Sequence, residues 1–235
     1  LIETAGAKLI PLNQIADVKR GFTTGANDFF YVIDETYKIK ELSDVEFKLQ
    51  FGFERKDSRI NWEKFGWYYS KLTKWHHLIE RRFLRPLFKT QKEAKYLDVD
   101  LKRLKYHVLI CNESLSILKK YRTKIAKYIE YAESQYNLHI KPTNAQRTSN
   151  GNGNGNERAW FNLGENLVIG DFIFPSKIGE KFRLIDNRKS KVYCDKVNYN
   201  IVLNKKYVKN AWIIFLILNS TIFRYLIDLF SRQLT

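Results

Sequence analysis

The sequence contains no methionine and only two cysteines among its 235 residues. Cys111 and Cys194 have no Cys-x-x-Cys companion, so neither a disulfide framework nor a zinc cluster is indicated. A reducing cytoplasm is the expected location. Because the chain begins at Leu1 and has no start methionine, we expect it to be part of a longer protein. A catalytic domain elsewhere in that protein would not be visible in this sequence.

Long hydrophobic runs are also missing. Residues 1–10 lack the apolar stretch of a signal peptide. The most apolar run, 211–218, is far shorter than the roughly 20 residues that a helix needs to span a bilayer. The sequence therefore predicts a soluble protein that does not have a membrane as its partner.

The common catalytic motifs are absent as well. The chain has no G-x-x-x-x-G-K-[ST] phosphate loop, no H-E-x-x-H zinc motif and no G-x-S-x-G nucleophile elbow. Its four histidines lack the spacing of metal ligands. The charged triplets 46–48 and 54–56 resemble parts of a nuclease centre, but such triplets are common by chance in a chain with 28% charged residues. We expect no catalytic residue, metal or cofactor in this chain.

Positive charge is what the sequence has in excess. Lysine and arginine number 41 against 25 acidic residues, which gives a net charge of +16, and 44% hydrophobic residues are enough for a buried core. A surplus of this size favours a polyanionic partner, with nucleic acid as the first candidate. A basic interaction module that binds an acidic protein or a membrane surface is the alternative.

Local patterns predict an α+β fold. We expect a twisted mixed or antiparallel β-sheet with flanking helices and a C-terminal apolar helix packed on it. The aromatic and β-branched run 29–33 predicts a buried strand. In the second half, short β-rich runs alternate with turn residues, at 167–169, 172–174, 182–185, 192–194 and 201–203.

Two helices are predicted from apolar residues that recur every three or four positions. The first begins at Asn112 or Ser114 and runs to Tyr136. Its other face is basic and is either simply solvated or in contact with phosphates, through Lys119, Lys120, Arg122, Lys124 and Lys127. The second helix closes the chain, with an apolar stripe from Val208 to Ile227.

The low-complexity segment divides the chain. Residues 148–159 are rich in glycine and asparagine, cannot bury apolar area and predict a mobile loop. Residues 1–147 form the first part, with the basic helix near 114–136, and 160–235 form a β-rich second part that ends in a helix. We expect the two parts to make one composite domain. In residues 34–110 the apolar residues follow neither a helical nor a strand period.

The segment 19–30, KRGFTTGANDFF, combines turn formers with hydrogen-bond donors. Gly21 and Gly25 allow turns that a Cβ would obstruct, while the lysine, arginine, threonine and asparagine side chains can reach phosphates or base edges. A glycine-kinked turn without any ligand is an equally good interpretation from physical chemistry alone.

Several segments resemble, in order, the C-terminal specificity domain of TaqI-type adenine-specific DNA methyltransferases, which is also found in fused restriction-modification enzymes. The likeness is carried by 15–30 (IADVKRGFTTGANDFF), 84–89 (LRPLFK), 95–97 (KYL), 160–163 (WFNL), 198–200 (NYN) and 216–220 (LILNS). The family's catalytic domain, with its glycine-rich cofactor loop and Asn-Pro-Pro-aromatic motif, has no counterpart in this sequence.

The resemblance implies a target-recognition domain that binds double-stranded DNA in a sequence-specific way. Methyl transfer would then belong to a fused or separate methyltransferase catalytic domain that uses S-adenosylmethionine, in some enzymes with an endonuclease attached. For each basic candidate, a solvated surface charge is the alternative. The residues expected to contact DNA are Lys19, Arg20, Thr23, Thr24, Asn27, Lys89, Lys177, Lys181, Arg183, Arg188 and Lys189. A structural role is expected for Trp160, Pro86, Pro175, Asn219 and Ser220.

Overall fold

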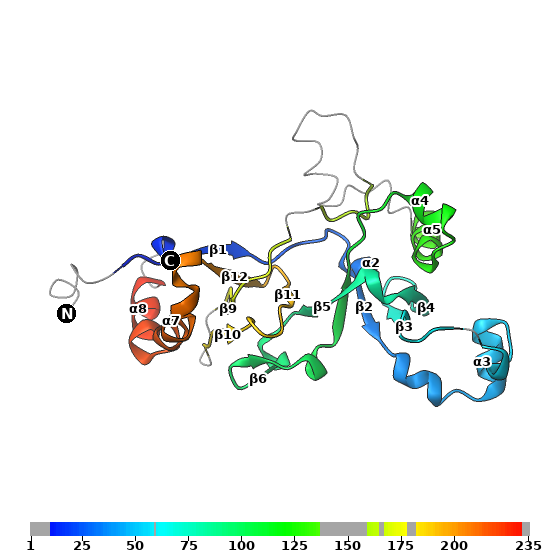
Figure 1. The fold of residues 1–235 in the computed structure, drawn as a ribbon, viewed down its shortest axis with the longest axis horizontal. Helices are drawn as coiled ribbons and strands as arrows, with labels where there is room; N and C mark the ends of the chain where they lie inside the picture. Colours follow the sequence, from blue (N-terminus) through cyan, green and yellow to red (C-terminus); the bar gives the residue numbers. More distant parts are fainter. Residues whose placement is uncertain (1–9, 59, 137–158, 165–166, 178–181, 232–235) are drawn as a thin grey trace. The chain divides into compact units, whose positions relative to one another are not determined.

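The computed structural model describes residues 10–58, 60–136, 159–164, 167–177 and 182–231 (Figure 1). The chain is an α+β protein, as the sequence predicts, and its strands form two open sheets. It divides into two compact units made of interleaved segments. Unit 1 comprises the described residues of Leu1–Phe22, Phe88–Leu104 and Val168–Thr235, and unit 2 those of Thr23–Leu87 and Lys105–Leu167. The predicted loop at 148–159 lies, except for Ala159, outside the described residues.

Unit 1 is built on a six-stranded mixed sheet. Neighbouring strands pair antiparallel except β7 and β10, which run parallel. The strand order is β1 (Ala16–Arg20), β12 (Asn198–Leu203), β9 (Phe172–Pro175), β10 (Ile185–Asp186), β7 (Asp98–Val99) and β6 (Ala94–Lys95). The short strand β11 (Tyr193–Cys194) precedes β12 in this unit.

The C-terminal helices cover this sheet. A 3₁₀ helix, Lys205–Asn210, leads into α7 (Ala211–Leu218) and α8 (Thr221–Ser231). Ala211, Phe215 and Leu218 of α7 are buried against Phe172 and Ile201 of the sheet, which confirms the predicted packing.

The predicted single closing helix is wrong, because the helical segment breaks at Asn219. The Asn219 side chain bonds to the backbone of Leu184, accepting at 2.9 Å from its N–H, and also donates to the carbonyl of Phe215. These bonds confirm the structural role expected for Asn219. Part of the predicted stripe, including Trp212, Leu216 and Ile222, is exposed instead of packed on the sheet.

Within the described residues, no single helix is long and apolar enough to cross a membrane. The helices Lys205–Leu218 and Thr221–Leu229 reach the required length and composition only when taken together, and they are bent by 67° where they meet.

The predicted strands of the second half are confirmed in part. β9 contains 172–174 and β12 contains 201–203, whereas 167–169 form no strand. Only 185 of the predicted strand 182–185 is in β10, because the backbone N–H of Leu184 bonds to the Asn219 side chain instead of to a neighbouring strand. Residues 193 and 194 of the predicted strand 192–194 form β11.

Unit 2 contains an antiparallel run of five strands. Their order is β5 (Leu84–Phe88), β8 (Tyr106–Leu109), β2 (Tyr31–Asp34), β3 (Phe65–Ser70) and β4 (Trp75–Glu80), with β4 at the edge. The predicted strand 29–33 is wrong in its first half. The carbonyl of Ala26 accepts from the N–H groups of Phe29 and Phe30, so these residues belong to a single helical turn, α2 (Asn27–Phe30).

The helix α3 (Asp44–Phe51) contacts this sheet at Trp67 of β3. A capping box starts it, in which the Ser43 hydroxyl accepts from the N–H of Glu46 and the Glu46 carboxylate accepts from the N–H of Ser43. It ends at Gly52 in the left-handed conformation. Phe47 packs on Trp67 in a small aromatic core.

The predicted helix 114–136 is two helices, α4 (Leu115–Lys120) and α5 (Lys124–Tyr136). Ser114 caps the first one as predicted, with its hydroxyl accepting from the N–H of Ile117. The chain leaves the helix at Arg122, whose φ of 50° no α-helix tolerates. The second helix, α5, begins where the buried Glu80 carboxylate accepts from the N–H groups of Lys124 and Ile125 at 2.5 and 3.0 Å.

Gly21 packs directly on the backbone of Asp195. A Cβ at position 21 would lie 2.2 Å from the carbonyl oxygen of Asp195. We therefore expect Gly21→Ala to lower the free energy of unfolding by about 1–3 kcal/mol, as overpacking does in cores. Urea denaturation followed by circular dichroism measures the change. Gly52→Asn is the control, because space is open at Gly52 and asparagine tolerates its positive φ; equal stability of the two variants would contradict the close contact.

Candidate nucleic-acid interface

One end of the sheet in unit 1 gathers basic side chains. The register sets Arg20 of β1 opposite Tyr199, and Asn198 of β12 opposite Pro175, so β1 and β9 finish where β12 begins. We call this the basic end of the sheet; its residues are Lys19, Arg20, Lys89, Lys177, Arg183 and Lys196. Five of these six were expected from the sequence to contact DNA.

Backbone contacts around the turn 195–198 hold the basic end together. The N–H of Gly21 donates to the carbonyl of Asn198 at 2.8 Å, and the Arg20 Nε donates to the carbonyl of Lys196 at 2.9 Å. The buried Asn198 side chain donates to the carbonyl of Lys89 at 3.2 Å. Residues from three distant segments therefore meet at one turn.

The remaining two basic residues reach the same end through their neighbours. Lys177 is exposed and follows Ser176, whose N–H donates to the carbonyl of Val197 at 3.0 Å. Arg183 precedes β10, and its Nη2 donates to the carbonyl of Gln91 at 2.9 Å. Because β10 runs antiparallel to β9, the approach to β10 lies at the end where β9 finishes.

Two described acids of this region, Glu93 and Asp195, accept hydrogen bonds from backbone N–H groups. The Glu93 carboxylate accepts from the N–H groups of Lys89 and Thr90 at 2.6 and 2.9 Å. Asp195 is buried and accepts from the N–H of Val197. Among the described ion pairs, none involves Lys19, Arg20, Lys177 or Lys196. Within the described residues, these four side chains therefore keep their positive charge.

Other expected contact residues lie elsewhere. Arg188 and Lys189 follow β10, beside the start of β9, and so occupy the opposite end of the sheet. The Arg188 guanidinium is paired with Asp186, Nε to Oδ1 at 3.0 Å, and this carboxylate raises the pKa of Arg188. Arg188 is thus already neutralised, while Lys189 is exposed.

The first turn provides fewer surface groups than the sequence suggests. Thr24 is 0% exposed; its hydroxyl donates to the Asn27 Oδ1 at 2.6 Å and accepts from the N–H of Ala26. Thr24 is therefore a turn residue without a surface atom for DNA, and Asn27 is half-buried beside it. Thr23 is exposed, and Lys181 lies outside the described residues.

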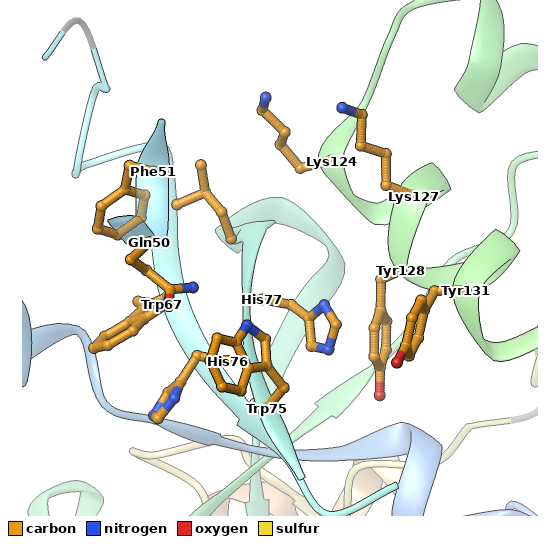
Figure 2. Close-up of a pocket in the computed structure, with 11 residues that line it drawn as sticks. Gln50, Phe51, Trp67, Trp75, His76, His77, Lys124, Lys127, Tyr128 and Tyr131 are labelled. Carbon is orange, nitrogen blue, oxygen red and sulfur yellow. The ribbon is translucent and has the colours of Figure 1, made fainter. Parts of the chain in front are cut away.

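Unit 2 carries a second feature, an open pocket of about 330 Å³ at its edge strand. Trp75, His76 and His77 of β4 line it, together with Trp67 of β3 and Gln50 and Phe51 of α3. The helix α5 contributes Lys124, Lys127, Tyr128 and Tyr131. Figure 2 shows both lysines at one end of the pocket, with Trp67 and Gln50 on one side and the two tyrosines on the other.

The positions in α5 explain this lining. Lys124, Lys127, Tyr128 and Tyr131 have the spacing i, i+3, i+4 and i+7, which places them on one face of a helix. Sequence reasoning noticed the two lysines but missed the pocket, because the aromatic residues of β4 and α5 are about 50 positions apart. The spacing of these four residues in the sequence could have shown that they share one face of a helix.

The pocket histidines are held by neighbours. The His76 ring stacks on Trp67, with centroids 4.0 Å apart, and its Nε2 lies 2.6 Å from the Glu35 carboxylate. The His77 ring lies 4.7 Å from that of Tyr128, and its Nε2 bonds to the Thr73 hydroxyl at 2.8 Å. Burial lowers the pKa of His77 to about 4, with a smaller contribution from His76, so His77 is neutral at pH 7.

The two cysteines lie inside the fold. Both cysteines are free and buried, and burial raises the pKa of Cys111 to about 11 and that of Cys194 to about 12. In the part of the chain that the structure describes, no three His, Cys, Asp or Glu side chains are grouped to hold a metal ion. Trp160 is buried and donates to Glu133 at 2.8 Å, a structural role as expected.

The neutral His77 gives a pH prediction. Its folded pKa lies below the unfolded value of about 6.5, so the unfolded chain binds the extra proton, and the stability due to His77 falls as the pH drops from about 6.5 to 4. The ring proton signals of His77 in NMR spectra, assigned with His77→Gln, should stay in the neutral form down to pH 5. A midpoint near 6.5 would contradict the buried environment.

The sequence was compared with protein-family models and with curated proteins, and neither comparison finds a match. A function is therefore inferred from the residues of this chain and from the resemblance that its segments carry.

Proposed function

We propose that this chain binds double-stranded DNA in a sequence-specific way, as the target-recognition domain of an adenine-specific DNA methyltransferase or restriction-modification enzyme. The observation that supports the proposal is the basic end of the sheet in unit 1. Basic residues from three chain segments meet there, and the described acids Glu93 and Asp195 accept from backbone N–H groups. Contacts to phosphates supply most of the affinity of such a surface.

The geometry of Arg20 suits the reading of a base. Its Nε is fixed by the Lys196 carbonyl, and no described group bonds to its two Nη atoms. A guanidinium that is held in this way loses less side-chain entropy on binding. Arginine pairs with the O6 and N7 acceptors of guanine in the major groove. We assign base reading to Arg20 and phosphate contacts to Lys19, Lys89, Lys177 and Lys196.

The resemblance adds the chemistry that this chain lacks. Methyl transfer to adenine would take place in a fused or separate catalytic domain that binds S-adenosylmethionine. Rotating the target adenine out of the stack costs a few kcal/mol, which contacts to the surrounding duplex must offset. This chain would provide those contacts and select the site.

A basic interaction module is the second candidate function. The exposed apolar side chains of α7 and α8, including Trp212, Ile213 and Ile217, favour a protein or membrane contact on that side of unit 1. Such a module would bind random DNA weakly or not at all, and with no preferred sequence.

Salt dependence tests the DNA contact. We expect the chain to bind a random-sequence duplex with an affinity that falls steeply between 50 and 200 mM salt, measured by fluorescence anisotropy. The triple variant Lys19→Gln/Lys177→Gln/Lys196→Gln should lower the slope of log K against log salt by about 0.9 for each lost phosphate contact.

The matched control removes the same charge from the opposite end of the sheet. Lys189→Gln/Lys205→Gln/Lys206→Gln changes three exposed lysines that lie beyond β10 and β12. Its slope should stay close to that of the unchanged chain. Equal slopes for the two triple variants would show that the basic end is not the DNA-binding surface.

Selection from randomised duplexes tests specificity. The unchanged chain should enrich one motif, and Arg20→Ala should weaken binding to that motif by about 1–3 kcal/mol and relax one position in it. Enrichment without any motif would leave only nonspecific binding and would reject target recognition.

A further inference from the structure

The pocket in unit 2 has a lining that fits an anion with an aromatic or planar part. Lys124 and Lys127 are exposed at one end, and none of the described residues that line the pocket carries a carboxylate. The acids that contact its lining are engaged: Glu35 with His76 and Lys38, and Glu80 with the backbone N–H groups that start α5. A cationic ligand would meet like charge, so the aromatic residues do not form a cage for an ammonium group.

Trp75 offers a surface for stacking. Its side chain is 59% exposed, and no ring contact is present for it among the described residues. The turn before it fixes the start of β4, because the Thr73 hydroxyl accepts from the N–H of Trp75 at 3.2 Å and bonds to His77. An exposed indole on a fixed strand is the platform on which unpaired bases stack in proteins that bind nucleic acids.

The size of the pocket limits the ligand. Its volume of 330 Å³ lies at the lower limit of the roughly 300–1,000 Å³ that ligand pockets occupy. One base with its sugar and phosphate is of this size. The Gln50 side chain adds an amide that points toward the middle of the pocket in Figure 2 and carries both donors and an acceptor for a base edge.

We infer that this pocket holds one unstacked nucleotide of the bound DNA, with the base against Trp75 and the phosphate at Lys124 and Lys127. The inference rests on the proposed function, since it takes DNA as the ligand. The helix N-terminus of α5 is closed to the phosphate by the Glu80 carboxylate, so the two lysine side chains bind the anion. The neutral ring of His77 adds an uncharged wall beside Tyr128.

A bulged duplex tests the inference with the full chain. The probes are a 20-base-pair random-sequence duplex and the same duplex with one extra unpaired dA in its middle. Because the unpaired base is already available, the chain should bind the bulged duplex about tenfold more tightly at equal salt. Trp75→Ala should remove this preference, because it should weaken binding to the bulged duplex more than binding to the paired duplex. Lys124→Gln/Lys127→Gln should reduce the preference and the salt dependence for the bulged probe.

Two control variants match these changes. Tyr121→Ala removes an exposed aromatic ring of the same unit outside the pocket, and Lys105→Gln/Lys120→Gln removes two exposed charges of the same unit outside it. Both should keep the preference for the bulged duplex. Circular dichroism should show that Trp75→Ala is folded, as expected for an exposed side chain.

The outcomes separate this inference from the proposed function. If the chain binds both duplexes equally, or if Trp75→Ala keeps the preference, the pocket does not hold a nucleotide, while DNA binding by the basic end stands. If the chain binds neither duplex, the proposed function fails and the inference fails with it.

Discussion

The close approach of Gly21 to Asp195 is the constraint on which the basic end depends. Only a residue without a Cβ can lie there, because an added Cβ would be 2.2 Å from the Asp195 carbonyl oxygen. This approach allows Gly21 to bond to Asn198 and Arg20 to bond to Lys196. Asn198 in turn fixes the backbone of Lys89. A small backbone detail thus determines where several cationic side chains meet.

A comparable arrangement shapes unit 2. The buried Glu80 at the end of β4 caps the start of α5, which fixes both the position and the rotation of that helix beside the edge strand. The Tyr128 hydroxyl adds a second anchor by donating to the carbonyl of Phe29 at 2.8 Å. With these groups fixed, one face of α5 must present its lysines and tyrosines to Trp75 and His77. In both units, side chains that form hydrogen bonds with the backbone fix the positions of the charged side chains at the surface.

Local patterns predicted what depends on local interactions. The Ser114 cap, the strand β9 and the second half of β12 follow from nearby residues and were predicted. The apolar stripe of α7 also indicated that this helix packs on the sheet. The short helix α2 was missed because the two phenylalanines favour a strand. The Ala26 carbonyl instead accepts hydrogen bonds from the N–H groups of Phe29 and Phe30, which holds them in a helical turn. The break at Arg122 was missed because it depends on Glu80, which is more than 40 positions away. The candidate lysines were predicted one by one from the sequence. Which of them lie at the same end of the sheet depends on the strand register, and no single segment specifies that register.

The central claim is that DNA contacts one end of the sheet in unit 1. Hydrogen–deuterium exchange of the full chain, with and without a random-sequence duplex at low salt, tests it most directly. We predict slower exchange at the backbone amides of 19–22, 89–91, 176–177 and 196–198, and unchanged exchange at 187–190 and 205–210. Protection that is confined to the second group, or spread evenly over the described residues, would contradict the account.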